Sequence, residues 1–344
     1  MNRVKQVNRV FLWTVILSIV GGFINSGILR YTNDYALIAI TSQLILILPA
    51  VIYIIVNKIN ITQQIRFKGL KISTIILLIL FAYLISPVMS FVNALSLLFF
   101  NNETSIIMSD IVGKHGIWVS LTLIALVPSI FEEAVYRGVF YNEYRKVNVL
   151  KGILLSGFMF GIVHGNLNQF SYAFIMGIIF ALVIEATDSI LSTMIIHFCI
   201  NGTSVFLLYI YPKLLTLLEA MYGGDQFSTS ELQSAIEGGL PADFNLEFVL
   251  TNYGLSAILC TILAVIVFKT IAKNNGRWDY IKSIFQRKDS LVVNEEEKSS
   301  IISISLVIAI VICVGLMVYY EVVTYQLNAS NTKELLSISF NFIK

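Results

Sequence analysis

Nine apolar segments, each long enough to cross a lipid bilayer as a helix, constrain this chain more than any other feature. They cover residues 10–29, 36–57, 73–99, 117–136, 149–166, 169–186, 189–211, 249–270 and 300–325. A helix needs about 20 such residues to span roughly 30 Å of hydrocarbon. Only 13% of the 344 residues are charged, against about 25% in soluble domains. We therefore expect an all-α fold, a polytopic membrane helical bundle of about nine transmembrane helices.

Lysine and arginine residues gather in alternate connections between these segments. They lie in residues 1–9, 58–71, 145–151 and 273–298, which share one side of the membrane if nine spans alternate. Because short basic loops stay in the cytoplasm, the pattern predicts a multi-pass protein of the plasma membrane. Its N-terminus is expected in the cytoplasm and its C-terminus outside. The loop EATDS after the sixth segment does not fit this pattern, since it has acids and no bases.

The order of the segments predicts four regions along the chain. Residues 1–115 form N-terminal transmembrane helices, 116–211 a candidate catalytic core, 212–248 an extracytoplasmic polar insert, and 249–344 C-terminal helices with a tail. Within the insert, TSELQSAIEGGLP is typical of a short capped helix that ends at Gly-Gly. The net charge of +2 is too small to imply a nucleic-acid partner. Three cysteines, all in apolar segments and none in a CxxC pair, indicate apolar packing instead of a disulfide framework.

Ionisable residues interrupt the apolar pattern in the fourth to seventh segments. They lie in FEEAVYRG (131–138), FGIVHGN (160–166) and IIHFCIN (195–201), and at Glu185. A charged side chain at mid-span costs about 2.5–3.5 kcal/mol on insertion scales, so such residues are functional candidates. The alternative for EEAVYR is a helix end at the membrane surface, where arginine reaches water. Glu185 is interpreted as a solvated residue of a short turn.

Helical spacing separates the roles of the two adjacent glutamates. Glu132 and Glu133 point about 100° apart on a helix, so they cannot share one role. Glu133 and Arg137 have the i,i+4 spacing of a helical ion pair, which would fix the helix. Glu132 is then left to face elsewhere, and a carboxylate in an apolar cavity suits a general base or acid. Pro128, one turn earlier, is expected to bend this helix and open space beside it.

Two of the three histidines lie inside apolar segments, each in helical register with another notable residue. His164 follows Phe160 by four residues, and His197 precedes Asn201 by four, so each pair shares a helix face. A lone histidine in a span is more often a structural hydrogen-bonding group. Together with Glu132, however, these residues supply a base, two imidazoles and an amide. That set is sufficient to activate a water and stabilise an oxyanion.

These residues carry a resemblance to a known family. In chain order the motifs are Glu132-Glu133-x-x-x-Arg137, Phe160-x-x-x-His164 and His197-x-x-x-Asn201. The set, over about residues 115–205, resembles the CAAX-protease and bacteriocin-processing family, also called CPBP or ABI. The resemblance implies an intramembrane CAAX-type endopeptidase. Its substrates would be peptides or membrane-anchored proteins of the prenyl or leader-peptide type, and its surroundings the lipid bilayer.

The resemblance also assigns roles to the residues by position. Glu132 and His164 would activate the attacking water, and His197 and Asn201 would form the oxyanion site. Structural support of the site would come from Glu133, Arg137 and Phe160. Without a resemblance, two other functions stay open for this pattern. One is a non-catalytic membrane scaffold or bacteriocin self-immunity protein of the same fold, and the other is a proton-coupled transporter.

Metal dependence is left open by the family, and the sequence favours a glutamic-type site without a cofactor. There is no HExxH pair of the zinc proteases. A Zn²⁺ site, the alternative, would have to use Glu132, His164 and His197, a His₂Glu set. Asn201 beside His197 is a poor zinc ligand and a good hydrogen-bond donor, which favours the metal-free assignment. One conflict remains: the segment bounds put His164 about 21 Å from the cytoplasmic end, far deeper than Glu132.

Overall fold

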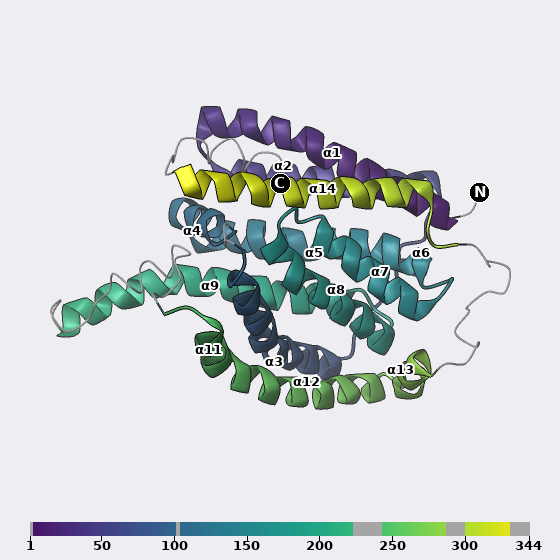
Figure 1. Ribbon diagram of the computed structural model, residues 1–344. Coiled ribbons are helices and arrows are strands. Elements are labelled where there is room, and N and C mark those ends of the chain that lie inside the picture. Colours follow the sequence, from purple (N-terminus) through teal and green to yellow (C-terminus); the bar gives the residue numbers. More distant parts are fainter. Residues whose placement is uncertain (1–2, 101–103, 223–242, 287–299, 331–344) are drawn as a thin grey trace.

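The computed structural model describes residues 3–100, 104–222, 243–286 and 300–330, and every regular element within them is a helix (Figure 1). The elements are α1 (Arg3–Thr32), α2 (Tyr35–Val56), α3 (Ile72–Leu97), α4 (Thr104–Ser120), η1 (Leu121–Leu126), α5 (Val127–Glu133), η2 (Ala134–Tyr141), α6 (Asn142–Tyr144), α7 (Val149–Ile162), α8 (Leu167–Thr187), α9 (Leu191–Tyr222), α11 (Leu246–Val249), η3 (Leu250–Gly254), α12 (Leu255–Asn274), α13 (Trp278–Phe285) and α14 (Ile304–Ser330). In these ranges, eight helices are long and apolar enough to cross a membrane, and α7 is a shorter apolar helix. The expected polytopic bundle is confirmed.

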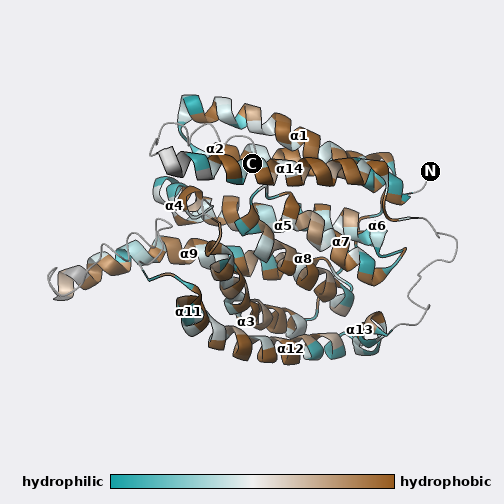
Figure 2. Ribbon diagram, viewed as in Figure 1, coloured by the Kyte–Doolittle hydropathy of each residue, from teal (hydrophilic) through white to brown (hydrophobic). Residues whose placement is uncertain are grey.

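The central helices are enclosed by two outer groups (Figure 1). The α7–α8 hairpin packs with the α5–η2 helix and α9, while α1, α2 and α14 cover one side and α3 with α12 the other. Figure 2 shows that these outer helices are largely hydrophobic. Their outward side chains include Leu44, Ile76, Ile262 and Val311, each more than half exposed. Apolar exposure on this scale suits contact with lipid and not with water.

Glycines allow α7 and α8 to approach closely. Gly157 and Gly161 are four residues apart on α7, the spacing that brings helix backbones together. A Cβ added to Gly177 of α8 would lie 2.6 Å from the Cα of Gly157, and one added to Gly161 would lie 2.9 Å from the Phe170 ring. The turn after α7, which carries His164, is therefore held by a tight helix pair.

Gly177→Ala is expected to destabilise the protein by about 1–3 kcal/mol, because the added methyl group meets backbone that cannot rotate away. Thermal unfolding in detergent would measure the loss. The matched control is Gly315→Ala on α14, where no atom lies within 4 Å of the added Cβ. Equal unfolding temperatures for the two variants would contradict the close approach.

The helix that carries Glu132 is longer than the predicted segment 117–136. It continues through η2 and α6 to Tyr144, and it begins at a kink where Gly116 has φ 73°. Residues before the kink lie between two of the predicted segments, yet they are helical and pack against α2 through Ile107 and Ile111. Glu132 thus lies about 18 Å from the end of its helix. This position removes the conflict in depth with His164.

The predicted polar insert 212–248 begins inside a helix. α9 continues past Pro212 to Tyr222, and α11 begins at Leu246 after the capping residue Asn245. The predicted short helix TSELQSAIEGGLP lies outside the described residues, as does the end of the C-terminal tail. Asn25 joins α1 to α2, since its Nδ2 donates to Ser42 at 3.0 Å and its Oδ1 accepts from Thr41.

Glu185 was interpreted as a solvated turn residue, and this interpretation is wrong. Its side chain is fully buried. The carboxylate accepts hydrogen bonds from Arg66 at 2.9 Å, from Arg145 at 2.8 and 2.9 Å, and from Tyr141 at 2.9 Å. Arg277 donates to its backbone carbonyl and lies 3.4 Å from the carboxylate. Three arginines from three loops therefore share one buried counter-charge.

This cluster places the basic loops at one end of the bundle. Arg66, Arg145 and Arg277 come from the connections after α2, α6 and α12, and Lys68 also pairs with Asp188 beside the cluster. Burial opposes the charge of Arg145, but Glu185 and neighbouring tyrosines together raise its pKa above the usual value. The acidic turn that did not fit the charge pattern is thus surrounded by the basic loops.

Candidate active site

The Glu132–Glu133 pair lies on a short α-helical stretch between two π-helical segments, η1 and η2. Such wider turns are frequent at functional sites. Pro128 has no N–H, so it cannot give the Ile124 carbonyl its α-helical hydrogen bond. Asn201 of α9 donates its Nδ2 to that oxygen at 3.1 Å. The amide therefore ties α9 to the fourth span where the backbone departs from α-helical geometry.

The expected ion pair is formed, and it also holds a histidine. Arg137 Nη1 donates to Glu133 Oε1 at 3.1 Å, with both side chains buried. The same oxygen lies 3.0 Å from Nδ1 of His197. A ring whose Nδ1–H donates to a carboxylate has a fixed tautomer and orientation. Glu133 therefore neutralises Arg137 and orients His197, a second role that the i,i+4 spacing did not indicate.

Phe160 lies at the centre of the group and contacts three of its members. Its ring is 4.2 Å from the Arg137 guanidinium carbon, and its centroid is 5.1 Å from that of His164 and 6.2 Å from that of His197. Phe180 lies 5.0 Å from the same guanidinium. Aromatic faces attract a desolvated arginine, which offsets part of its burial cost. Phe160 thus packs against both imidazoles and the arginine and helps to fix their relative positions.

His164 lies in the turn between α7 and α8 and not within a span, as the segment 149–166 implied. The turn reverses at Gly165, where φ is 74°. Nδ1 of His164 is 2.7 Å from the Phe160 carbonyl oxygen, so this nitrogen carries the hydrogen and donates it. In the neutral ring Nε2 is then the acceptor nitrogen. An acceptor at this position suits the orientation of a water molecule.

The carboxylate of Glu132 has two oxygens in different surroundings, and its side chain is 14% exposed. Oε1 accepts a hydrogen bond from Nε2 of Gln43 at 2.9 Å. Oε2 lies 3.9 Å from Nε2 of His197. That separation exceeds a direct hydrogen bond, but one water about 2.8 Å from each atom fits it. The second oxygen is thus the one that faces the imidazole.

The structure brings the predicted residues together to different degrees. Glu132, Glu133, Arg137 and His197 form a contiguous group, and His164 joins it through Phe160. Asn201 lies one turn further along α9, with one N–H committed to a backbone oxygen. Gln43 was missed, although a glutamine in the apolar run LIAITSQLILIL is a costly residue of the same kind as the others.

The side chains of Glu132, His164 and His197 are not arranged as the three ligands of a zinc ion. Within the described parts of the chain, no group of three or more His, Cys, Asp or Glu has the arrangement needed to hold a metal ion. His197 uses Nδ1 for Glu133, so only Nε2 faces Glu132. The side chains as placed therefore do not fit a zinc ion, and a chelator experiment tests metal dependence.

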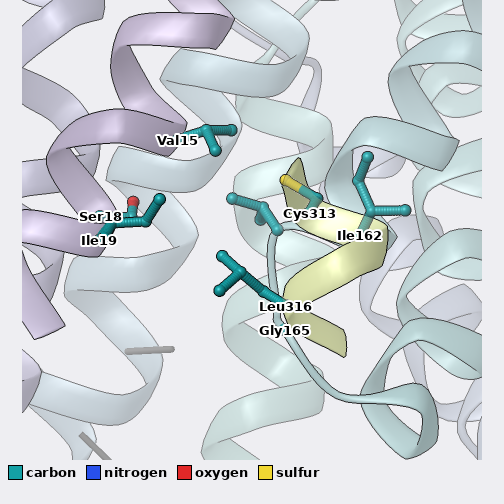
Figure 3. Close-up of a pocket in the computed structure, with 8 residues that line it drawn as sticks. Val15, Ser18, Ile19, Ile162, Gly165, Cys313 and Leu316 are labelled. Carbon is teal, nitrogen blue, oxygen red and sulfur yellow. The ribbon is translucent and has the colours of Figure 1, made fainter. Parts of the chain in front are cut away.

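A small pocket lies beside the His164 turn (Figure 3). It is lined by Val15, Ser18, Ile19, Ile162, Val163, Gly165, Cys313 and Leu316. These residues come from α1, α14, the end of α7 and the α7–α8 turn, so the pocket lies where α1 and α14 meet the central hairpin. It is mostly apolar, and neither Glu132 nor His197 lines it. The pocket borders the candidate site and is not the site itself.

The fold and these side chains define a polytopic membrane protein with a buried glutamate, histidine and arginine constellation in its central helices. Residues 114–203 match a family model described as Type II CAAX prenyl endopeptidase Rce1-like. The match confirms the expected resemblance over nearly the expected range and supports an intramembrane protease function. All seven predicted site residues fall within it, whereas α1–α3, α12 and α14 lie outside. No curated protein and no solved structure matched the chain.

Proposed function

We propose that this protein is an intramembrane endopeptidase that hydrolyses peptide bonds of membrane-associated substrates with water activated by Glu132. The observation that supports it most is the approach of Glu132 Oε2 to His197 Nε2, which lie 3.9 Å apart. Gln43 holds the other carboxylate oxygen, and Glu133 holds the other ring nitrogen. Each reactive atom is thus backed by a fixed partner, as preorganised catalysis requires.

In the proposed reaction Glu132 takes a proton from a water, whose oxygen attacks the peptide carbonyl carbon. Nε2 of His164 accepts a hydrogen bond from the other O–H of the water, which orients the water and leaves that hydrogen on its oxygen. The oxyanion accepts hydrogen bonds from His197 Nε2–H and from the second N–H of Asn201. With His197 protonated, the charges of Glu132, Glu133, Arg137 and His197 sum to zero. The C–N bond then breaks, and Glu132 passes its proton to the leaving amine.

The proposed substrates are leader peptides, such as those of bacteriocins, or membrane-anchored proteins cleaved near the bilayer. The proposed orientation places the N-terminus in the cytoplasm. It is supported by the convergence of the basic loops around Glu185, because basic connections stay on the cytoplasmic side. The site would then be reached from the cytoplasmic half of the membrane.

The test is cleavage of a quenched fluorescent peptide library by the purified protein in detergent or proteoliposomes. We expect cleavage that persists in the presence of EDTA and 1,10-phenanthroline, because Glu132 and the histidines act without a metal in this mechanism. Loss of activity with chelator that zinc restores would replace the metal-free assignment with the zinc one. No cleavage of any library member would favour the scaffold or self-immunity function.

A further inference from the structure

Gln43 is a polar residue of α2 that lies outside the segment matched by the family model. It lies near the middle of an apolar helix, where a side-chain amide is costly unless it is hydrogen-bonded. Its Nε2 donates to Oε1 of Glu132 at 2.9 Å. The hydrogen bond joins residues 89 apart in the chain. A helix of the N-terminal region therefore reaches the proposed base directly.

The groups around Glu132 give this contact a distinct task. His197 of α9 faces Oε2, while Arg137 and Tyr136 of η2 and Tyr172 of α8 lie within range of the carboxylate charge. Gln43 contributes a neutral donor to the opposite oxygen. A neutral amide does not compete for the proton, but it fixes the rotation of the carboxylate. Oε2 is then kept toward His197.

The other end of the amide adds a second observation. Oε1 of Gln43 is buried and has no hydrogen-bond partner among the described residues. Buried acceptors are usually satisfied. An acceptor beside the base suits a water that binds in the site. The amide of Gln43 thus has its donor committed to the carboxylate and its acceptor left without a partner among the described residues.

We propose that Gln43 is a positioning residue, which holds Oε1 of Glu132 so that Oε2 acts as the base toward the water. This inference rests on the proposed endopeptidase function. Because Gln43 acts through Glu132, its loss alters the geometry and ionisation of the base and leaves the substrate contacts elsewhere unchanged.

The experiment compares Gln43→Met, Gln43→Glu and the control Ser42→Ala in the cleavage assay across pH. Ser42 is the neighbouring residue on α2, and its bond to Asn25 joins α1 and α2 away from Glu132. Gln43→Met keeps the volume and removes the donor. We expect kcat to fall about 10- to 100-fold, with KM within about twofold, because near-attack geometry is lost. Ser42→Ala should retain the wild-type kcat.

The pH at which activity falls on the acidic side of the pH profile separates a positioning role from a purely structural one. Loss of a purely structural residue would not shift this acidic limb. The amide donor stabilises the ionised carboxylate, so its removal should shift the limb to higher pH. Gln43→Glu, which places a second carboxylate against Glu132, should shift it further in the same direction. If size-exclusion chromatography shows that Gln43→Met is not folded, the nearly isosteric Gln43→Glu provides the test. The acidic limb of its pH profile is then compared with that of the wild type.

Wild-type kcat and an unmoved limb in a folded Gln43 variant would overturn this inference. That result is distinguishable from failure of the proposed function, in which Glu132→Ala would also retain activity. An inactive Glu132→Ala together with a fully active Gln43→Met would refute only the role of Gln43.

Discussion

Glu132→Gln is expected to lower kcat/KM for peptide cleavage by about 10²- to 10⁴-fold while the protein stays folded. A positioned general base contributes about 10²- to 10⁴-fold, and the amide cannot take a proton from water. The substitution is nearly isosteric, and the side chain is partly exposed and not part of the buried ion pair. The cleavage assay measures the activity, and size-exclusion chromatography with thermal unfolding measures the fold.

The matched control is Asp110→Asn, which removes a carboxylate from the part of α4 that precedes the Gly116 kink. Asp110 pairs with Lys114 one turn away, and the kink separates both residues from the helix that carries Glu132. This variant should keep activity within about twofold, since exposed pairs contribute roughly 0–1 kcal/mol. Glu132→Gln with more than a tenth of wild-type activity would contradict the assignment of this carboxylate as the base.

Glu185→Gln is expected to lower the free energy of unfolding by about 3–5 kcal/mol, the cost of removing one partner from a buried charge cluster. The substitution keeps the shape and removes the negative charge that Arg66, Arg145 and Arg277 share. Because the guanidinium groups are largely buried, water cannot fully replace the negative charge of Glu185. Denaturant or thermal unfolding in detergent would measure the loss.

Asp188→Asn is the control for this cluster. Asp188 is 30% exposed, and it pairs with Lys68, which is 46% exposed, and at 3.6 Å with the buried Arg66. Because Arg66 keeps Glu185 as its closer partner at 2.9 Å, removal of the Asp188 charge should cost only about 1 kcal/mol. The double variant Glu185→Gln with Arg277→Gln should be less destabilised than the two single losses added together, because one unpaired charge is removed. Similar small losses for Glu185→Gln and Asp188→Asn would refute the role of the buried carboxylate.

The spans and much of the site could be predicted because their signals are local. Apolar blocks of fixed length identified the helices, and the i,i+4 spacing identified the Glu133–Arg137 pair, which the structure forms. His164 and His197 stood out because imidazoles are costly in an apolar segment. Both lie around Phe160, as the structure now shows.

The remaining features depend on partners that are distant in the chain. Glu185 looked solvated because its counter-charges come from three separate loops. The fourth span was drawn too short because its last residues are polar, and hydropathy cannot tell a polar residue buried in protein from one in water. Residues 137–143 illustrate this, since all of them are buried. Gln43 lacked a visible role until Glu132 was found beside it.

The arrangement around Glu185 also sets an order on biogenesis. The ribosome delivers Arg66 first, Glu185 119 residues later, and Arg277 a further 92 residues on. Arg66 is therefore without Glu185 until α8 has been synthesised. Arg277, the last arginine to pair with Glu185, follows only after α12. The cluster at this end of the bundle consequently assembles in the order of translation. A chain truncated before α8 would lack Glu185 and could not form the cluster.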